Sequence, residues 1–191
     1  MLKFNCLRCG DCCRNLIVET IEGVHSGLAL FPEETKHFPN EFVIPYRGRG
    51  SYPGEKDFKT VMFQLAVDVC PHLGTVDNLT TCEIYDERPL SCRCFPFQPI
   101  NVDRCGRITV YVGPECKAIQ KTKKENPTVS NKKIGIEALA EEKSCYLLWS
   151  RISEIDRSAQ GWTFDLKYQE WLPTSSRVQM SRAESRAIFR T

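Results

Sequence analysis

Cysteine carries most of the chemistry that this sequence could perform. The chain of 191 residues contains eleven cysteines, and ten of them lie between Cys6 and Cys116. Thiolates bind zinc, hold iron–sulfur clusters, pair as disulfides and act as nucleophiles. An odd number of thiols leaves one over after pairing, so a disulfide scaffold is a poor explanation. The sequence therefore predicts a metal-binding or redox function in the part that ends near Cys116.

The densest group of thiols is the run Cys6-Leu-Arg-Cys9-Gly-Asp-Cys12-Cys13. A C-x-x-C turn followed by glycine brings two sulfurs to one metal, and a positive φ at Gly10 would let backbone N–H groups face the thiolates. Cys9 and Cys12 repeat this spacing, as in runs that hold iron–sulfur clusters. Side chains of neighbouring residues diverge, so we expect Cys13 to serve a second metal, a bridge or a redox role.

Four later cysteines stand beside turn residues and complete a set of eight thiols. Eight sulfurs suit two four-coordinate metals, or one cubane cluster and one tetrahedral metal. We therefore predict one or two centres that hold zinc or an iron–sulfur cluster. The predicted ligands are Cys6, Cys9, Cys12, Cys13, Cys70, Cys82, Cys92 and Cys116.

The remaining cysteines are expected to be structural or incidental: Cys94, Cys105 and Cys145. The polar residues expected around the ligands are Arg14, His72, Tyr85, Arg88 and Arg93. The arginines would lower the cost of gathering negative sulfurs, or would pair with nearby carboxylates instead. The histidine could be a ligand, a proton carrier or a polar neighbour, and the tyrosine a hydrogen-bond donor or a packing residue.

The elements that must position these thiols are short. Residues 16–18 and 60–67 read as strands, and the second leads directly into Cys70. Residues 95–100 and 108–112 flank a turn in the manner of a β-hairpin. The metal-binding part is therefore expected to consist of short strands and loops stapled by metal–thiolate bonds.

The last third of the chain has a different composition. Residues 121–133 contain five lysines and read as an exposed connection. Residues 134–159 have the apolar spacing of a helix, residues 162–169 alternate like a strand, and residues 181–190 could form a last short helix. The prediction is an α+β protein with a cysteine-cluster domain at 1–120, a basic connecting loop at 121–133 and a mostly helical C-terminal extension at 134–191.

Composition argues against several classes of partner. Lysine and arginine total 26 against 24 aspartate and glutamate, so the average charge favours neither nucleic acid nor an anionic membrane. No apolar run reaches the roughly 18 residues of a membrane span, and the first residues lack the apolar stretch of a secretory leader. We expect a cytoplasmic protein whose partners are metal ions and, in addition, a protein partner or substrate.

Three motifs in order resemble one known family. They are the stretch from Phe4 to Arg14, the tetrapeptide Cys70-Pro71-His72-Leu73, and the stretch from Cys82 to Pro96. They resemble small proteins named for a C-x-x-C-x-x-C-C cluster and described as zinc- or iron-chelating, a family that also includes bacterial flagellin lysine N-methylases. The resemblance implies metal binding by the shared cysteines.

Two functional hypotheses follow. The first is a zinc or iron–sulfur protein that acts as a redox or protein-modifying, methyl-transferring component. The alternative is a non-catalytic structural zinc module that shapes a surface for protein interaction. No nucleophile–base pair stands out in the sequence, so it names no catalytic residue and leaves open whether the protein is an enzyme. An open ligand position would separate the two hypotheses, because structural zinc sites are closed.

Overall fold

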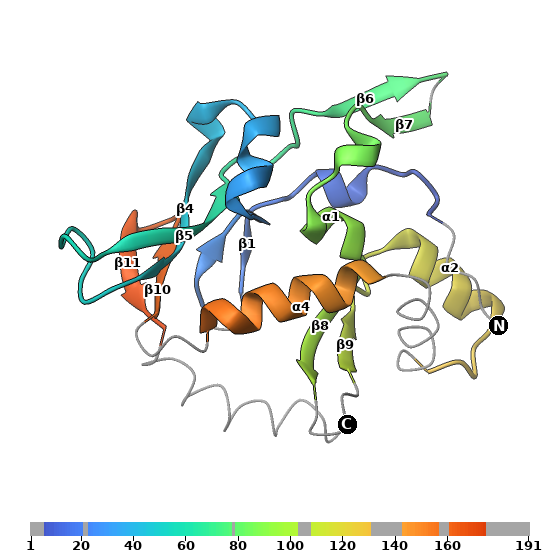
Figure 1. The fold of residues 1–191 in the computed structure, drawn as a ribbon. Coiled ribbons are helices and arrows are strands. Elements are labelled where there is room, and N and C mark those ends of the chain that lie inside the picture. Colours follow the sequence, from blue (N-terminus) through green and yellow to red (C-terminus); the bar gives the residue numbers. More distant parts are fainter. Residues whose placement is uncertain are drawn as a thin grey trace. The chain divides into compact units, whose positions relative to one another are not determined.

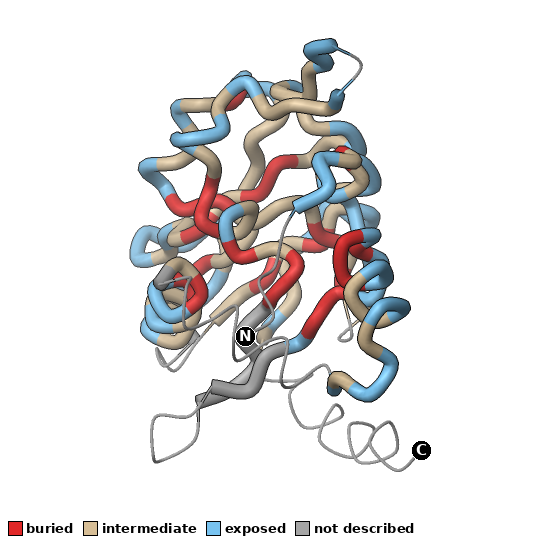
Figure 2. The backbone as a smooth tube through the Cα atoms, turned by 90° about the vertical axis from the view of Figure 1, so that its right-hand side faces the viewer, coloured by how far each residue is buried: buried red, intermediate tan, exposed pale blue. Residues whose placement is uncertain are grey.

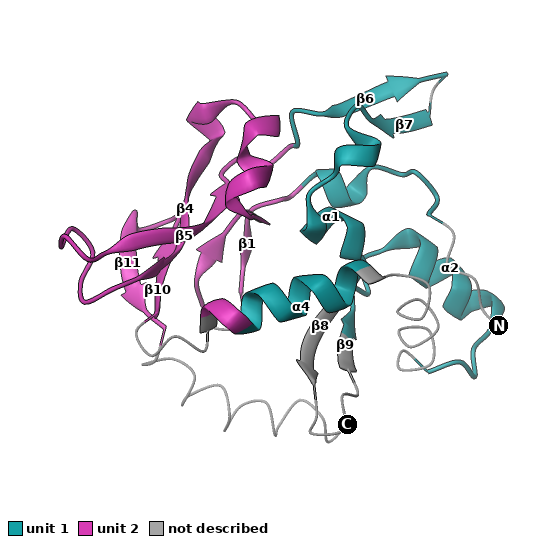
Figure 3. Cartoon of the chain, in the orientation of Figure 1, with its two compact units in different colours: residues 1–14, 70–153 teal, residues 15–69, 154–191 magenta. Residues whose placement is uncertain are grey.

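The computed structural model describes residues 6–20, 23–77, 79–102, 108–130, 143–156 and 161–174. Its elements are drawn in Figure 1, and it contains both strands and helices, which confirms the α+β class. Contacts divide the chain into two compact units, shown in Figure 3. Unit 1 comprises residues 1–14 and 70–153, and unit 2 comprises residues 15–69 and 154–191.

Unit 1 holds every described cysteine. Its short 3-10 turns are η1 (Asp11–Cys13) and η4 (Tyr85–Glu87), and its hairpins are β6 (Leu73–Val76) with β7 (Leu79–Cys82) and β8 (Phe97–Val102) with β9 (Ile108–Val112). Its helices are α1 (Leu90–Cys94), α2 (Lys117–Glu125) and α4 (Lys143–Asp156), whose last residues are assigned to unit 2.

The core of unit 1 is built where these helices and the β8–β9 hairpin bury apolar side chains. The buried residues, red in Figure 2, include Leu90, Phe97, Val112, Ile119 and Leu148. Cys145 on α4 is fully buried, and its thiol lies 3.5 Å from the carbonyl oxygen of Phe97, to which it donates.

Unit 2 is built on an antiparallel five-stranded sheet in the order β11-β10-β4-β5-β3. These strands are β3 (Leu28–Leu30), β4 (Val43–Arg49), β5 (Lys59–Leu65), β10 (Gly161–Asp165) and β11 (Glu170–Pro173). A separate ribbon pairs β1 (Val18–Glu19) with β2 (His25–Ser26), and the 3-10 turns η2 (Pro32–His37) and η3 (Asn40–Phe42) precede β4. Strands far apart in the chain thus meet, because β4 pairs with β10.

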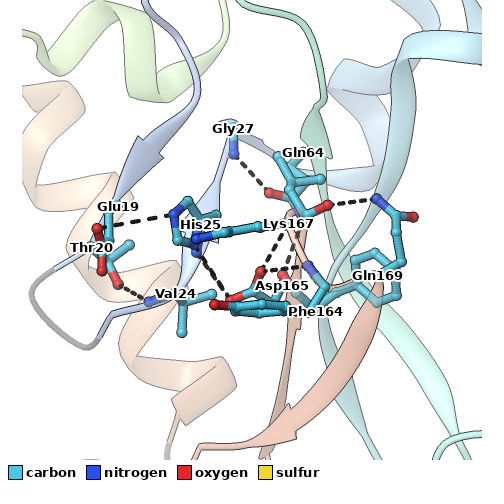
Figure 4. A network of polar contacts seen from close by, with 12 residues as sticks. Glu19, Thr20, Val24, His25, Gly27, Gln64, Phe164, Asp165, Lys167 and Gln169 are labelled. Atoms are coloured by element: carbon cyan, nitrogen blue, oxygen red, sulfur yellow. Dashed lines mark hydrogen bonds and ion pairs between the residues drawn. The ribbon is translucent and has the colours of Figure 1, made fainter.

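Two buried polar side chains organise the interior of unit 2 (Figure 4). The fully buried amide of Gln64 accepts from the backbone N–H of Gly27 at 2.8 Å and donates to the carbonyl oxygen of Pro45 at 2.8 Å. The fully buried carboxylate of Asp165 accepts from three backbone N–H groups, those of His25, Lys167 and Tyr168. Buried polar groups of this kind are tolerated because they are hydrogen-bonded.

Several predicted elements are confirmed. The strand expected at 60–67 is β5, and the hairpin expected around 95–112 is β8–β9. The helix expected at 134–159 is confirmed at Lys143–Asp156, and its earlier part lies outside the described residues, as does the short helix expected at 181–190. Leu147, expected on the buried face of that helix, is 53% exposed.

The expectation of a mostly helical C-terminal extension is wrong within the described residues. Gly161–Asp165 and Glu170–Pro173 form strands that join the main sheet of unit 2. The strand expected across 162–169 ends at Asp165, because Gln169 has φ 53° and the intervening residues form a turn closed on the Asp165 carboxylate. Residues 161–173 therefore complete a sheet that begins before residue 70.

The structure also divides the chain differently from the predicted boundaries at 120 and 133. The helix α2 runs through Lys121 to Glu125, so this part of the expected loop is helical. Residues 15–69 group with the end of the chain rather than with the cysteine-rich part, because β4 pairs with β10. No helix within the described ranges is long and apolar enough to cross a bilayer.

Candidate metal centre

The C-x-x-C-x-x-C-C loop has the backbone geometry of a thiolate-binding turn. Arg8 and Gly10 have φ of 50° and 75°, and the N–H of Arg8 donates to the sulfur of Cys6 at 3.4 Å. A side chain at position 10 would collide with Thr80 and Arg14. The prediction that glycine here adopts a positive φ and that an N–H group faces a thiol is confirmed.

Cys12 and Cys13 end this loop in the 3-10 turn η1. Their sulfurs lie 3.9 Å apart, so the expectation that the two side chains diverge is wrong. Two sulfurs on one tetrahedral zinc, each at about 2.3 Å, would be about 3.8 Å apart. The 3-10 turn directs both side chains to the same side, so the two sulfurs have the spacing of two ligands on one metal ion.

Cys70 is brought to this pair by the backbone. Its N–H donates to the carbonyl oxygen of Cys13 at 2.8 Å. The β6–β7 hairpin starts three residues later and pairs Leu73 with Cys82, which returns the chain to the same place. Cys70 and Cys82 are thus set at the two open ends of one hairpin.

Cys92 comes from the short helix α1, which begins after Pro89. Residues two apart on a helix point to nearly opposite sides, so Cys92 and Cys94 face different surroundings. Cys94 is buried at 1% exposure in the core of unit 1, which agrees with a structural role. Cys105 lies outside the described residues.

Five of the predicted ligands form one electrostatic cluster, called here the five-thiol group: Cys12, Cys13, Cys70, Cys82 and Cys92. The hydrogen bond between the two thiols raises the pKa of Cys12 and lowers the pKa of Cys13. Burial raises the pKa of Cys70 and Cys92, and repulsion from neighbouring thiolates raises both further. The fold therefore brings together thiols that cannot all ionise at once unless a cation lies among them.

The other three predicted ligands form a second set, called here the three-thiol group: Cys6, Cys9 and Cys116. Cys116 is the N-cap residue of α2 and is 8% exposed. Burial raises the pKa of Cys116, and repulsion from the thiolates of Cys9 and Cys6 raises it further. The backbone amides of Ile119 and Ala118 lower it.

Asp11 and Lys117 are polar residues at this second group that the sequence analysis did not single out. Their side chains form an ion pair at 3.0 Å, which links the cysteine loop to the start of α2. Hydrogen bonding to Lys117 is the largest effect that lowers the pKa of Asp11, and Cys9 contributes a smaller one. The sequence signal was available, because Asp11 lies between two cysteines and Lys117 follows Cys116 directly.

Arg88 lies close enough to the five-thiol group for its positive charge to lower the pKa of Cys12 and of Cys92. Its guanidinium carbon lies 3.8 Å from the centre of the Tyr85 ring, and its Nε donates to the Tyr85 carbonyl oxygen at 2.8 Å. Tyr85 thus contributes a stacking face, and its ring is 51% exposed. Arg93 donates to the carbonyl oxygens of Arg88 and Asp86, so it braces the turn before α1.

His72 and Arg14 are placed near the thiols in different ways. The backbone amide of His72 faces the Cys70 thiol and lowers its pKa against the effect of burial. The ring of His72 lies 3.6 Å from the carboxylate of Glu83, across the start of the β6–β7 hairpin. Arg14 is exposed, and its positive charge acts to lower the pKa of Asp11 and of Lys117.

The donor set fits a soft metal, although it is not closed around one point. Every predicted ligand is a sulfur, which suits zinc or an iron–sulfur cluster. Among the described residues, no three side chains of His, Cys, Asp or Glu already converge as ligands of one ion. Within those residues, the thiols therefore do not surround one point in this structure.

Thiols gathered from four separate segments of the chain define a cysteine-cluster protein of the α+β class. A family model described as CxxCxxCC, "Putative zinc- or iron-chelating domain", matches residues 5–128. Since this match covers more than half of the 191 residues, the chain belongs to the CxxCxxCC family, whose description supports metal binding. No curated protein and no solved structure matches the chain.

Proposed function

We propose that the chain binds metal at two places in unit 1, with the five-thiol group as the principal centre and the three-thiol group as the second. The observation that carries this proposal is the clustering of thiols from residues 12–13, 70, 82 and 92, whose pKa values show mutual repulsion. Gathering such groups without a cation is unfavourable, and thiolate–metal bonds reverse that cost.

The principal centre would take four of its five sulfurs, because zinc and each iron–sulfur cluster accept four protein thiolates. Zinc bound there would act as a Lewis acid or a staple, and an iron–sulfur cluster would carry electrons. Arg88 offsets the negative charge of the thiolates, and the main-chain amide of His72 faces Cys70.

A fifth sulfur favours a reactive centre over a closed one. Four ligands complete a structural zinc site, so the remaining thiol of the five would stay available for exchange or redox chemistry. Cys12 is exposed and Cys13 partly so, which leaves this edge of the group open to solvent. We therefore favour a redox or protein-modifying component, of which methyl transfer is one form.

The alternative, a structural zinc module, is favoured by a different observation. The ligands come from a loop, both ends of a hairpin and a helix, so one metal would hold these separate segments together. Such a site can supply about 10–16 kcal/mol that doubles as folding energy. The interaction surface of this alternative would then be shaped by the stapled segments.

The test is the metal content and absorption spectrum of the full chain purified without oxygen. Iron with stoichiometric sulfide and visible charge-transfer bands would support the redox reading, and colourless zinc would support the structural module. A chain that purifies with neither metal, and that takes up neither zinc nor a reconstituted cluster, would contradict the proposal.

A further inference from the structure

A cluster of positive charge in unit 2 has no role in the thiol chemistry. Arg49 of β4 and Lys59 of β5 are register partners, so their side chains leave the sheet on the same face. Both residues are exposed, and neither forms an ion pair within the described ranges. Like charges directly opposite each other destabilise a sheet, and an anion placed between them would remove that repulsion.

A third positive charge lies next to this pair in a fixed position. Arg47 and Arg49 pair with Thr163 and Gly161, which lie two residues apart on β10 in unbroken register, so the two arginines share a face although the β4–β5 register shifts next to Arg47. The guanidinium of Arg47 donates to the hydroxyl of Thr163, which is 4% exposed, at 3.0 Å, and its central carbon lies 5.1 Å from the centre of the Tyr46 ring. This guanidinium is therefore held in place before any ligand arrives.

The neighbouring strand provides hydroxyl groups and a position without a side chain. Gly161 of β10 pairs with Arg49 and contributes no side chain of its own beside the arginine. Thr174 lies over this glycine, with its hydroxyl 3.1 Å from where a Cβ of residue 161 would be and 3.3 Å from the hydroxyl of Thr163. The absence of a side chain at Gly161 therefore leaves the room that the Thr174 hydroxyl takes.

The acid closest in sequence does not neutralise this cluster. Asp57 lies two residues before Lys59, but its carboxylate accepts from both the N–H and the hydroxyl of Ser51 at 2.9 Å. These bonds fix the acid on the connection between β4 and β5. Arg49 and Lys59 thus keep their positive charges on a face that also carries two hydroxyl groups.

We propose that Arg47, Arg49 and Lys59, together with the Thr174 hydroxyl, bind a phosphate group. Guanidinium groups match the oxygens of phosphate in paired hydrogen bonds, and lysine adds a point charge. The phosphate could be inorganic phosphate or the monoester of a nucleotide, which share this chemistry. The site lies wholly in unit 2 and does not depend on metal at the thiols.

The experiment is a titration of the full chain with inorganic phosphate at constant ionic strength, followed by calorimetry and by amide chemical shifts. The variants Arg49→Gln and Lys59→Gln change exposed residues and should fold normally. We expect each to weaken phosphate binding about tenfold or more. The matched control Lys36→Gln removes one exposed positive charge from η2 and should leave the dissociation constant unchanged.

Two further measurements complete the test. The variant Arg49→Gln, free of phosphate, should melt at a higher temperature than the wild type, because the repulsion from Lys59 is gone. Tighter binding of a nucleoside monophosphate than of phosphate would identify the monoester as the source, and equal binding would identify the free ion. Absence of phosphate binding, an equal response to chloride, or equal loss in Lys36→Gln would overturn the proposal.

Discussion

The backbone N–H of Cys70 donates to the carbonyl oxygen of Cys13 at 2.8 Å, although 57 positions separate the two residues. The chain leaves unit 1 after Arg14, forms the first strands of unit 2, and returns at Cys70. Together with the bond from the Leu16 N–H to the Asp68 carbonyl oxygen at 3.0 Å, this bond closes the excursion at the place where the thiols gather. It explains how motifs so far apart in the sequence can serve one site.

Removing thiols from one group should release the metal of that group alone. The double variant Cys70→Ser/Cys82→Ser leaves the five-thiol group with three thiols, and we expect metal content to fall by the whole occupancy of that centre because four thiolates are needed. Cys6→Ser should remove only the metal of the three-thiol group. Metal analysis of both variants checks this, and loss of all the metal from either variant would show that the eight thiols do not form two separate groups.

The local part of this architecture could be predicted from the sequence. The positive φ at Gly10, the strand before Cys70 and the β8–β9 hairpin all follow from residues close together in the chain. The spacing of the cysteines gave the eight candidate ligands and indicated more than one centre. How those eight divide into groups could not be predicted, because the grouping depends on which segments meet in space.

The pairing of strands that are far apart in the sequence could not be predicted either, because it also depends on which segments meet in space. The pairing of β4 with β10 joins residues more than 110 positions apart, and neither strand's own sequence specifies its partner. Composition placed a boundary in the lysine-rich stretch after residue 120, but Cys116 caps a helix there, and α2 continues to Glu125. Lysine suits an exposed helix face as well as a loop, so composition alone could not distinguish the two.

Arg88 should set the pH at which the five-thiol group loads with metal. Its charge lowers the pKa of Cys12 and Cys92, so removing it lets protons compete better for the sulfurs. We expect Arg88→Gln to shift the pH of half-maximal metal occupancy upward, by up to about one unit. Arg88→Lys keeps the charge and should shift it less. A pH profile of zinc uptake measures this, and a downward shift in Arg88→Gln would contradict the assignment.

Cys145 should matter for stability and not for metal. Its side chain is fully buried on α4 and donates to the carbonyl oxygen of Phe97. Cys145→Ala should lower the free energy of unfolding by about 1 kcal/mol through the small cavity and the lost contact, with metal content unchanged. Ser150→Ala on the exposed side of the same helix is the control, and urea denaturation is the measurement. Loss of metal in Cys145→Ala would place this residue in the site.

Asp165 should make unit 2 sensitive to acid. Burial raises its pKa, but the hydrogen bonds from the amides of Tyr168, His25 and Lys167 outweigh this and hold the pKa below its usual value. A lowered folded pKa stabilises the protein at pH values above the unfolded pKa of about 3.9, and this stabilisation is lost as pH falls through the folded pKa. Asp165→Asn should therefore destabilise by about 2 kcal/mol at neutral pH.

The pH dependence separates this effect from a general loss of packing. Between about pH 4 and pH 2, the wild type should lose stability more steeply than Asp165→Asn, because the variant has no carboxylate to protonate. Asp68→Asn changes an exposed acid in the same unit and should leave the wild-type slope unchanged. Thermal unfolding at each pH measures this stability. If the wild type and Asp165→Asn lose stability equally as the pH falls, the carboxylate does not act in this way.

Residue-by-residue alkylation of the metal-loaded full chain tests the central claim most directly, with mass spectrometry used to read each cysteine before and after a strong chelator. The account predicts that Cys12, Cys13, Cys70, Cys82 and Cys92 are protected as a set, save for one sulfur left free, and become reactive together when metal is removed. Cys94 and Cys145 should stay protected in both states, because burial shields them. Reactivity of Cys70, Cys82 and Cys92 that is the same with and without metal would contradict the account.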